Sequence, residues 1–442
     1  MVSRNNSMRL VAMLAALGAA PLAAQAPVRL SFSDAVRRAA GEAPTVALAT
    51  LRTDEADAQV QQARSALLPS LSLGGGWFNR SFSSASIGFS SASLPIPPLI
   101  GPFNNYDARV TVTQTLFDWS SVMRVRAANA QADGSRAERG VTVEAAAQAA
   151  AVAYLRAARA QTVVAARQAD SSIAAELVTL AEAQKAAGVS AAIDVTRART
   201  QLVRAEGLLI VARNERDRGR IVLARTLGID PATPLELADT LAGTLGAADL
   251  PAGRDAVLTV ALAGRPDLGA ELARATAARR TGTAIRAERL PRVGVEADYG
   301  LNGMTVPSAL STRQVALEVT IPILDGFRRE ARLSEQDAVV RESEVRERDL
   351  RQQITADVDA ALLDLRSAEA QQLIAADQLR LAEDELSQSR QRFKAGVAGN
   401  IEVIDAQSNL IRARDTDIDA RFAAASARVA LARAAGVART AH

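Results

Sequence analysis

Cysteine is absent from the 442-residue sequence, and the single histidine is the last residue, His442. These absences exclude thiol nucleophiles, disulfides, cysteine–histidine metal sites and every histidine-based triad or acid–base pair. Aromatic residues make up 3% of the chain, whereas 48% of it is hydrophobic and alanine dominates. Because alanine buries little area and is the best helix former, we expect closely packed helices and no thick core. The missing catalytic residue types lead us to expect no enzymatic activity and no cofactor or metal ion, although a carboxylate-only or lysine-based enzyme remains open at this point.

Charge of one sign is also scarce, since 52 Lys and Arg residues face 49 Asp and Glu residues. No basic stripe with interleaved aromatics is present, so nucleic acid is not an expected partner. Long hydrophobic runs are missing too: no run of about 18 uncharged apolar residues could form a membrane-spanning helix. Residues 1–26 instead read as a secretory signal, with Arg4 and Arg9 before a short apolar stretch and cleavage after Ala24 or Ala26.

Three blocks of sequence occur twice, in the same order and roughly 210 residues apart. The paired blocks are LPSLSLGGGW from Leu68 with LPRVGVEADY from Leu290, TLFDW from Thr115 with PILDG from Pro322, and KAAGVSAAIDV from Lys185 with KAGVAGNIEV from Lys394. That period is too long for a solenoid and indicates a duplicated unit. We therefore divide the exported chain into a first repeat (27–228), an inter-repeat segment (229–265) and a second repeat (266–442).

Each repeat contains a very long stretch without proline. The pattern predicts helices over 120–187, 192–227, 327–395 and 400–435. The third of these, about 69 residues long, would form a rod of roughly 100 Å. Gly188 and Gly396 follow the long helices, where a left-handed residue ends a helix well, and Ser190 and Asn400 are the expected N-caps of the returning helices.

Alternating apolar and polar residues predict two strands in each repeat, over 70–82, 107–118, 292–302 and 312–323. About ten alternating residues suffice for a tilted strand to cross a bilayer, although a soluble sheet with one wet face gives the same pattern. Residues 83–105, rich in Ser, Pro and Gly, are expected to form an exposed loop. Four strands cannot close a membrane barrel, so a spanning protein must oligomerise.

These features together resemble the TolC-type outer-membrane efflux channel family over nearly the whole exported chain. The matching motifs are the Leu-Pro pairs at Leu68 and Leu290, the TLFD and PILDG runs, and the block FKAGVAGNIEVIDAQ from Phe393. The resemblance implies a mainly α protein with a membrane β-barrel portion: a homotrimer with a twelve-stranded barrel in outer-membrane lipid and a twelve-helix α-barrel in the periplasm. It also implies a periplasmic adaptor and an inner-membrane pump of the RND or ABC class as partners.

The implied function is a passive exit channel for a tripartite efflux pump, gated at its periplasmic tip. Polypeptide secretion of type I is an alternative. A non-conducting coiled-coil surface protein is another, although it would not explain the duplication, and a periplasmic adaptor would need a lipoyl-like β-domain that the sequence does not display.

The same resemblance implies a ring of carboxylates at the tip, to which Asp194, Glu402 and Asp405 correspond. Crowded carboxylates attract cations, so we expect a narrow, cation-preferring and divalent-sensitive entrance. Each acid could instead merely favour a helix N-terminus through the helix dipole. Phe393 and Ala398 stand where the family has a tyrosine and an arginine, and Arg197 is our candidate for a substitute lock.

The barrel strands also carry charges that alternate with apolar residues. These are the expected lumen residues Glu296, Asp298, Glu318 and Arg109. Their balance is acidic and again favours cations.

Overall fold

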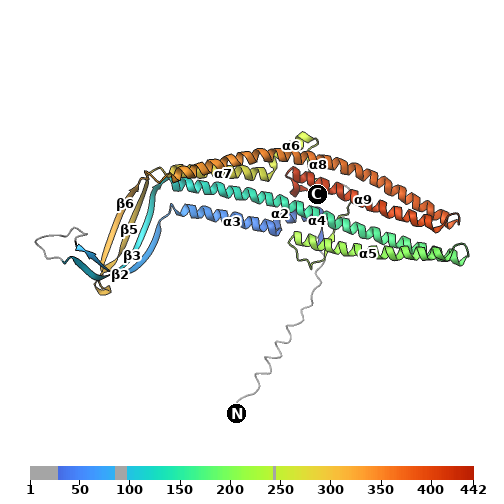
Figure 1. Cartoon of the computed structure of the whole chain (residues 1–442), viewed down its shortest axis with the longest axis horizontal. Coiled ribbons are helices and arrows are strands. Elements are labelled where there is room, and N and C mark those ends of the chain that lie inside the picture. Colours follow the sequence, from blue (N-terminus) through green and yellow to red (C-terminus); the bar gives the residue numbers. More distant parts are fainter. Residues whose placement is uncertain (1–27, 85–96, 242–244) are drawn as a thin grey trace, which may run out of the picture.

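A four-stranded sheet and two long helical hairpins lie at opposite ends of an elongated molecule (Figure 1). The computed structural model describes residues 28–84, 97–241 and 245–442. The expected signal peptide therefore lies outside the described residues. Within these ranges, no helix combines the length and apolar character needed to cross a membrane.

The first half of the described chain runs from the middle of the molecule to the sheet and then along its full length to the far tip. Its elements are β1 (Val28–Leu30), α2 (Phe32–Glu42), α3 (Pro44–Ser65), β2 (Ser70–Ser83), β3 (Leu99–Asp118), α4 (Trp119–Ala186) and α5 (Ala192–Thr226).

The second half follows a similar course. Its elements are β4 (Leu235–Leu237), α6 (Arg254–Gly264), α7 (Pro266–Ala287), β5 (Arg292–Gly303), the 3-10 turn η2 (Val306–Ser308), β6 (Leu310–Thr320), α8 (Arg328–Lys394), α9 (Asn400–Ala434) and the 3-10 turn η3 (Ala438–Thr440).

The sheet has the strand order β2–β3–β5–β6, and all of its pairs are antiparallel. Residues opposite each other in such a sheet point to the same face. One row of paired residues is apolar: Leu71, Val112, Ala297 and Val315. The next row is polar and lies on the opposite face: Ser72, Thr111, Asp298 and Gln314. The alternation in the sequence thus gives the sheet one apolar and one polar face.

Two predicted strand boundaries are wrong. β3 begins at Leu99, eight residues before the predicted start at 107, because residues 99–106 continue the pairing with β2 in what the sequence suggested was a loop. β6 ends at Thr320 rather than at 323. Pro322 follows, and a proline has no N–H to donate to a sheet ladder.

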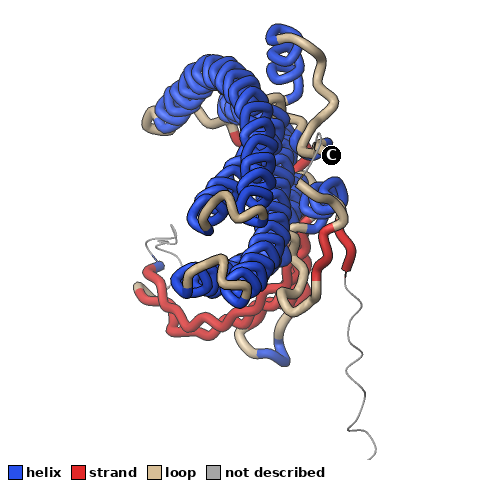
Figure 2. Tube along the Cα trace, turned by 90° about the vertical axis from the view of Figure 1, so that its right-hand side faces the viewer, coloured by secondary structure: helices blue, strands red, loops and turns tan. Residues whose placement is uncertain are grey.

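The long helix α4 occupies the centre of the helical layer. It packs against α3 and α7 in the half nearest the sheet, and against α5 and α9 in the half nearest the tips. α8 packs against α7 and then α9. Seen end-on, the helices form a curved layer rather than a closed bundle (Figure 2). α3, α5 and α8 therefore lie at the lateral edges of a wall.

The most extensive buried cluster lies halfway along α4, where α2, the β1–β4 pair and the C-terminal turn η3 cover it. β1 and β4 pair in parallel and so join the start of the chain to the inter-repeat segment. Tyr154 is fully buried, meets Phe32 edge to face with ring centroids 5.6 Å apart, and donates a hydrogen bond of 2.9 Å to the carbonyl of Leu30.

Both hairpin turns close through a left-handed glycine. Gly188 has φ +75° and Gly396 has φ +71°. The amides of Val189 and Val397 then reach back to the carbonyls of Gln184 and Arg392, at 2.9 and 3.0 Å. These bonds satisfy carbonyl groups that the helix ends leave free.

The predicted N-caps Ser190 and Asn400 are wrong, because the caps are Ala191 and Gly399. At the first turn, the Asp194 carboxylate accepts the Ala191 amide at 3.3 Å and takes over the capping role. At the second turn, Asn400 is already helical and fully buried. Its side-chain amide donates to the carbonyl of Asp194 at 2.8 Å, so it links the two hairpins instead of capping its own helix.

Candidate functional site

The polar face of the sheet gathers the charged residues expected to line a channel. Arg109 lies opposite Gly74 on one side and Gly300 on the other. A Cβ on Gly300 would lie 2.4 Å from the carbonyl oxygen of Ala108, so only glycine permits this close strand approach. Arg109 Nη1 donates to Asp298 Oδ1 at 3.1 Å. The structure thus brings together two of the sequence-predicted residues.

The sequence reasoning missed other charges on this face, namely Asp107, Arg80 and Arg292. Asp107 accepts a hydrogen bond from Arg109 Nε at 2.7 Å and another from Asn302 Nδ2 at 3.0 Å. Its position two residues before Arg109 could have revealed it, since such residues share a face in a strand. Glu296 and Glu318 lie on the same face, opposite Thr113 and Gly294 respectively.

The opposite face of the sheet leaves large apolar side chains uncovered. Leu73 is 80% exposed, Val315 77% and Leu317 65% in the single chain. A contiguous exposed apolar patch of this kind marks a surface that meets lipid or another protein. The sheet therefore has one exposed apolar face and one charged face.

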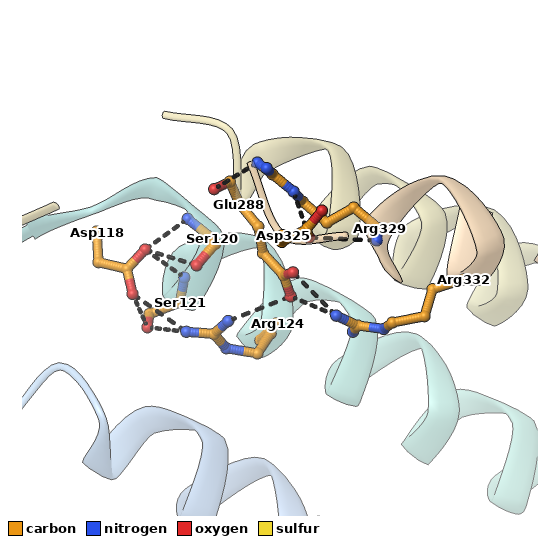
Figure 3. A network of polar contacts seen from close by, with 8 residues as sticks. All are labelled: Asp118, Ser120, Ser121, Arg124, Glu288, Asp325, Arg329 and Arg332. Atoms are coloured by element: carbon orange, nitrogen blue, oxygen red, sulfur yellow. Dashed lines mark hydrogen bonds and ion pairs between the residues drawn. The ribbon is translucent and has the colours of Figure 1, made fainter. Parts of the chain in front are cut away.

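A network of ion pairs joins the sheet to the helical layer (Figure 3). Asp118, at the end of β3, accepts the amides of Ser120 and Ser121 at 2.9 and 3.2 Å and caps α4. Arg124 reaches from α4 to Asp118 at 3.1 Å and to Glu288 at 3.8 Å.

The second repeat contributes to the same network. Arg332 of α8 binds the Glu288 carboxylate at 2.9 Å, and Arg329 binds Asp325 at 2.8 Å. Desolvation opposes ionisation of Asp325, but hydrogen bonds from Arg329 outweigh it and hold the pKa of that carboxyl below its usual value. The beginnings of α4 and α8 are thereby fixed to the end of α7, next to the sheet.

The far tip contains the residues expected to form a gate. Asp194 lies in the first turn of α5, and Arg197 contacts it at 3.8 Å within the same helix. Glu402 lies in the first turn of α9 and pairs with Arg392 of α8 at 3.3 Å. Asp405 is exposed on α9. Arg392 was not singled out from the sequence, although its place in the last turn of α8 favours a carboxylate partner nearby.

Phe393 is buried rather than exposed to a passage. It is 3% exposed and packs within an apolar cluster that draws on all four tip helices. Its carbonyl accepts a hydrogen bond of 2.8 Å from the side-chain amide of Gln184, across the two hairpins. The clustered acids of the described residues form no group suited to holding a metal ion.

The sheet has one lipid-compatible face and continues into two helical hairpins, whose first helices, α4 and α8, are 68 and 67 residues long. This arrangement defines the wall of a membrane channel rather than a catalytic site. The chain is similar in fold to the CmeC outer membrane channel of Campylobacter jejuni, with a TM-score of 0.76 and 15% identity over 92% of this chain and 86% of that one. It is similar also to the outer membrane protein VceC of Vibrio cholerae, with a TM-score of 0.71 and 19% identity over 92% and 96% of the two chains.

Sequence comparison gives the same result. The chain is 29% identical to the protein CyaE of Bordetella pertussis over 395 residues, which cover 88% of this chain and 80% of that protein. The model of the outer membrane efflux protein family matches residues 35–229 and 257–437. The chain belongs to this family. It is an outer-membrane channel of the efflux class and not an enzyme, so the family, location and class expected from the sequence are confirmed.

Proposed function

We propose that three copies of the chain form a continuous exit duct, with a barrel in the outer membrane and a helical tunnel in the periplasm. The observation that carries the proposal is the pair of open sheet edges, β2 and β6. In lipid, an open edge leaves backbone N–H and C=O groups without partners. β6 of one copy pairing with β2 of the next would satisfy both edges and give twelve strands.

The helical layer supports the same head-to-tail arrangement. The edge that contains β2 continues into α3 and α5, and the edge that contains β6 continues into α8. Both edges expose aliphatic side chains that a neighbour would cover: Val203, Ile210 and Val211 on α5, and Leu363, Leu373 and Ile374 on α8. Two different surfaces that meet by rotation close into a ring, whereas a self-complementary surface gives only a dimer.

The division of the chain fits this scheme. Residues 1–26 would direct export, and the repeats 27–228 and 266–442 would each supply two strands and one hairpin. The segment 229–265, which contains β4 and α6, would thicken the wall at mid-length.

The tip would be the gated entrance. Three copies of Asp194, Glu402 and Asp405 would place like charges around one axis, where they attract cations and repel one another. Each hairpin turn also exposes two aliphatic residues, namely Val189 and Ile193 on the first and Val397 and Ile401 on the second. This apolar rim supports docking of a periplasmic adaptor, through which an inner-membrane pump of the RND or ABC class would deliver substrate.

The duct would prefer cations along its length, because the polar face of the sheet carries the four carboxylates of Asp107, Glu296, Asp298 and Glu318 against the three arginines Arg80, Arg109 and Arg292. The test is the reversal potential of the purified protein in a planar bilayer under a salt gradient. We expect cation selectivity that decreases in the Glu402→Gln, Asp405→Asn double variant. Asp377→Asn, an exposed change on α8 away from the turn, is the control.

Anion preference of the unmodified protein, or an unchanged selectivity in the double variant, would contradict the acidic entrance. Co-purification of the inner-membrane pump distinguishes small-molecule efflux from polypeptide secretion. An RND pump favours small-molecule efflux, and an ABC exporter that carries a polypeptide favours secretion.

A further inference from the structure

The two hairpins of one chain meet along α4 and α9, and this seam must change whenever one hairpin moves relative to the other. Near the tip the seam is apolar, with Leu177 of α4 packed in the same cluster as Val403 and Leu410 of α9. Near mid-length it is apolar again, with Ile418 and Val429 in the cluster around Tyr154. Between these two clusters lies a buried ionic segment.

Four charged residues form this segment, which we name the seam cluster: Arg167, Asp170, Arg414 and Asp415. Arg414 Nη1 donates to Asp170 Oδ1 at 2.6 Å. Arg167 donates to both oxygens of Asp415, at 2.6 and 2.7 Å, and also to Asp170 Oδ2 at 3.1 Å. Two charge-assisted bridges of opposite polarity therefore cross from α4 to α9.

Burial makes these bridges consequential. The side chain of Asp170 is 3% exposed, that of Arg167 11% and that of Arg414 20%, whereas that of Asp415 is 41% exposed at the rim of the cluster. Charges that lose water are costly unless they are paired, so separating the helices at this level must be accompanied by hydration of the three buried members. Apolar residues of similar size often give a more stable contact than a buried ion pair. An ionic contact is instead suited to an interface that fixes the alignment of two helices or that changes between two states.

The spacing on α9 extends the polar character of the seam. Asn400, Gln407 and Arg414 recur every seven residues, the period that keeps one helix facing another. Gln407 donates to the carbonyl of Asp170 at 3.4 Å, and Asn400 to that of Asp194 at 2.8 Å. Within the described residues, the remaining side-chain oxygens of Asn400 and Gln407 are buried without a hydrogen-bond partner. An interface with such groups has a low net stability.

The ion pairs of the expected gate acids do not join the hairpins. Arg197 and Asp194 belong to one helix, and Arg392 and Glu402 belong to the two arms of one hairpin. Moving one hairpin past the other leaves both pairs intact. A pair that does cross near the tip, Arg390 of α8 with Glu176 of α4 at 3.1 Å, involves a carboxylate that is 70% exposed and so contributes little. The seam cluster, some 16 residues before the end of α4, lies roughly 24 Å from the tip by the helix rise and is broken by that movement.

We propose that the seam cluster is the latch that holds the two hairpins of each chain together in the closed channel, and that opening separates Asp170 from Arg414 and Arg167 from Asp415. This inference rests on the proposed channel function. It assigns four positioning residues to the gate at a level above the acidic ring, which then attracts ions without holding the hairpins together.

The first test compares single-channel recordings of Asp170→Asn with the unmodified protein. The asparagine keeps the shape but leaves Arg414 without its countercharge, so we expect an open probability about tenfold higher or more. The matched control is Glu182→Gln. It removes an ion pair of 2.7 Å between α4 and α5, within the first hairpin, and should leave gating unchanged.

The second test uses the absence of native cysteine. In the Asp170→Cys, Arg414→Cys variant the latch is missing, so the channel should open more often. A reducible bis-methanethiosulfonate cross-linker should close it, and reduction should open it again. Glu182→Cys with Arg199→Cys, cross-linked within the first hairpin, should show neither effect. This reversible design keeps the test valid even where a substitution lowers expression.

An Asp170→Asn channel that gates like the Glu182→Gln control would overturn the latch, as would a cross-linked channel that still opens. Both outcomes presuppose ion conduction by the unmodified protein. A complete lack of conductance in every variant would instead count against the proposed function, so the two failures are distinguishable.

Discussion

The long helices α4 and α8 occupy corresponding places in the two repeats and have almost the same length, 68 and 67 residues, yet they meet very different surroundings. Twenty residues of α4 are buried, among them many alanines, against ten of α8. α8 instead has a highly charged first half and several exposed leucines in its second half. The difference follows from position, because α4 has helices on both sides whereas α8 lies at a lateral edge.

This comparison explains how a duplicated sequence can form an open wall. The copy in the centre is rich in alanine, which allows close helix approach at little entropic cost. The copy at the edge has charged residues where it meets water and aliphatic residues where it would meet a neighbour. The two helices should therefore respond differently to equivalent substitutions.

The largest effect is expected in the middle of α4. Tyr154→Ala removes a fully buried ring and its hydrogen bonds to Leu30 and Asp239, and should reduce the free energy of unfolding by about 3–5 kcal/mol. Chemical denaturation followed by circular dichroism measures it. Leu373→Ala on α8, where the side chain is 73% exposed, should cost the isolated chain far less. Equal losses of unfolding free energy in the two variants would contradict the distinction between a central α4 and an α8 at the edge.

The next effect concerns assembly rather than folding. Leu373→Asp introduces a charge on the exposed aliphatic stripe of α8 and should shift the protein from oligomer to monomer, because an unpaired charge is costly in a buried interface. Size-exclusion chromatography with light scattering reports the change. Gln371→Asp, two residues away, is the control and should leave the oligomer intact. Oligomers of normal stability in Leu373→Asp would show that this stripe faces no partner.

A smaller effect involves the buried carboxyl of Glu144 on α4. Desolvation is the largest influence and raises its pKa above 4.5, despite a hydrogen bond from the Ala438 amide at 2.8 Å and the nearby Arg439. The folded state then retains a proton that the unfolded state has released. Stability is therefore lost as the pH rises from about 4.5 through the folded-state pKa, by about 1.4 kcal/mol for each unit of the shift.

Glu144→Gln should abolish this loss, so that the variant gains stability relative to the unmodified protein as the pH rises toward neutrality. Thermal unfolding between pH 4 and 8 measures the difference. A stability difference that is the same at every pH would mean that Glu144 titrates alike in the folded and unfolded chains.

The smallest effect is expected on the charged face of α8. Arg346→Ala removes an exposed pair with Glu342 one helical turn away, and should change the free energy of unfolding by no more than about 0.5 kcal/mol. Chemical denaturation at low and high salt is the measurement. A loss above 1 kcal/mol would indicate that this face of α8 contributes to a folded interface.

Features encoded locally were predicted well from the sequence. Gly188 and Gly396 do adopt the left-handed conformation that ends each long helix, and the alternation around Val295 and Val315 does place polar and apolar residues on opposite faces of the sheet. These features depend on backbone geometry and on period, which a short stretch of sequence carries.

Features that depend on distant partners were not predicted. The start of β3 at Leu99 depends on pairing with β2, and Asn400 is drawn away from a capping role by a carbonyl on the other hairpin. Asp170 and Arg414 are 244 residues apart in sequence, and each resembles many other charges along its own helix. Nothing short of the packing of α4 on α9 distinguishes them.

Native mass spectrometry of the detergent-solubilised protein is the most direct test of the lateral edges on which the proposed duct depends. If β2, α5 and α8 are completed by neighbouring copies, the particle should contain three chains, and Leu373→Asp should reduce it to one. If the unmodified protein remains a folded, helical monomer under the same conditions, the trimeric duct is contradicted.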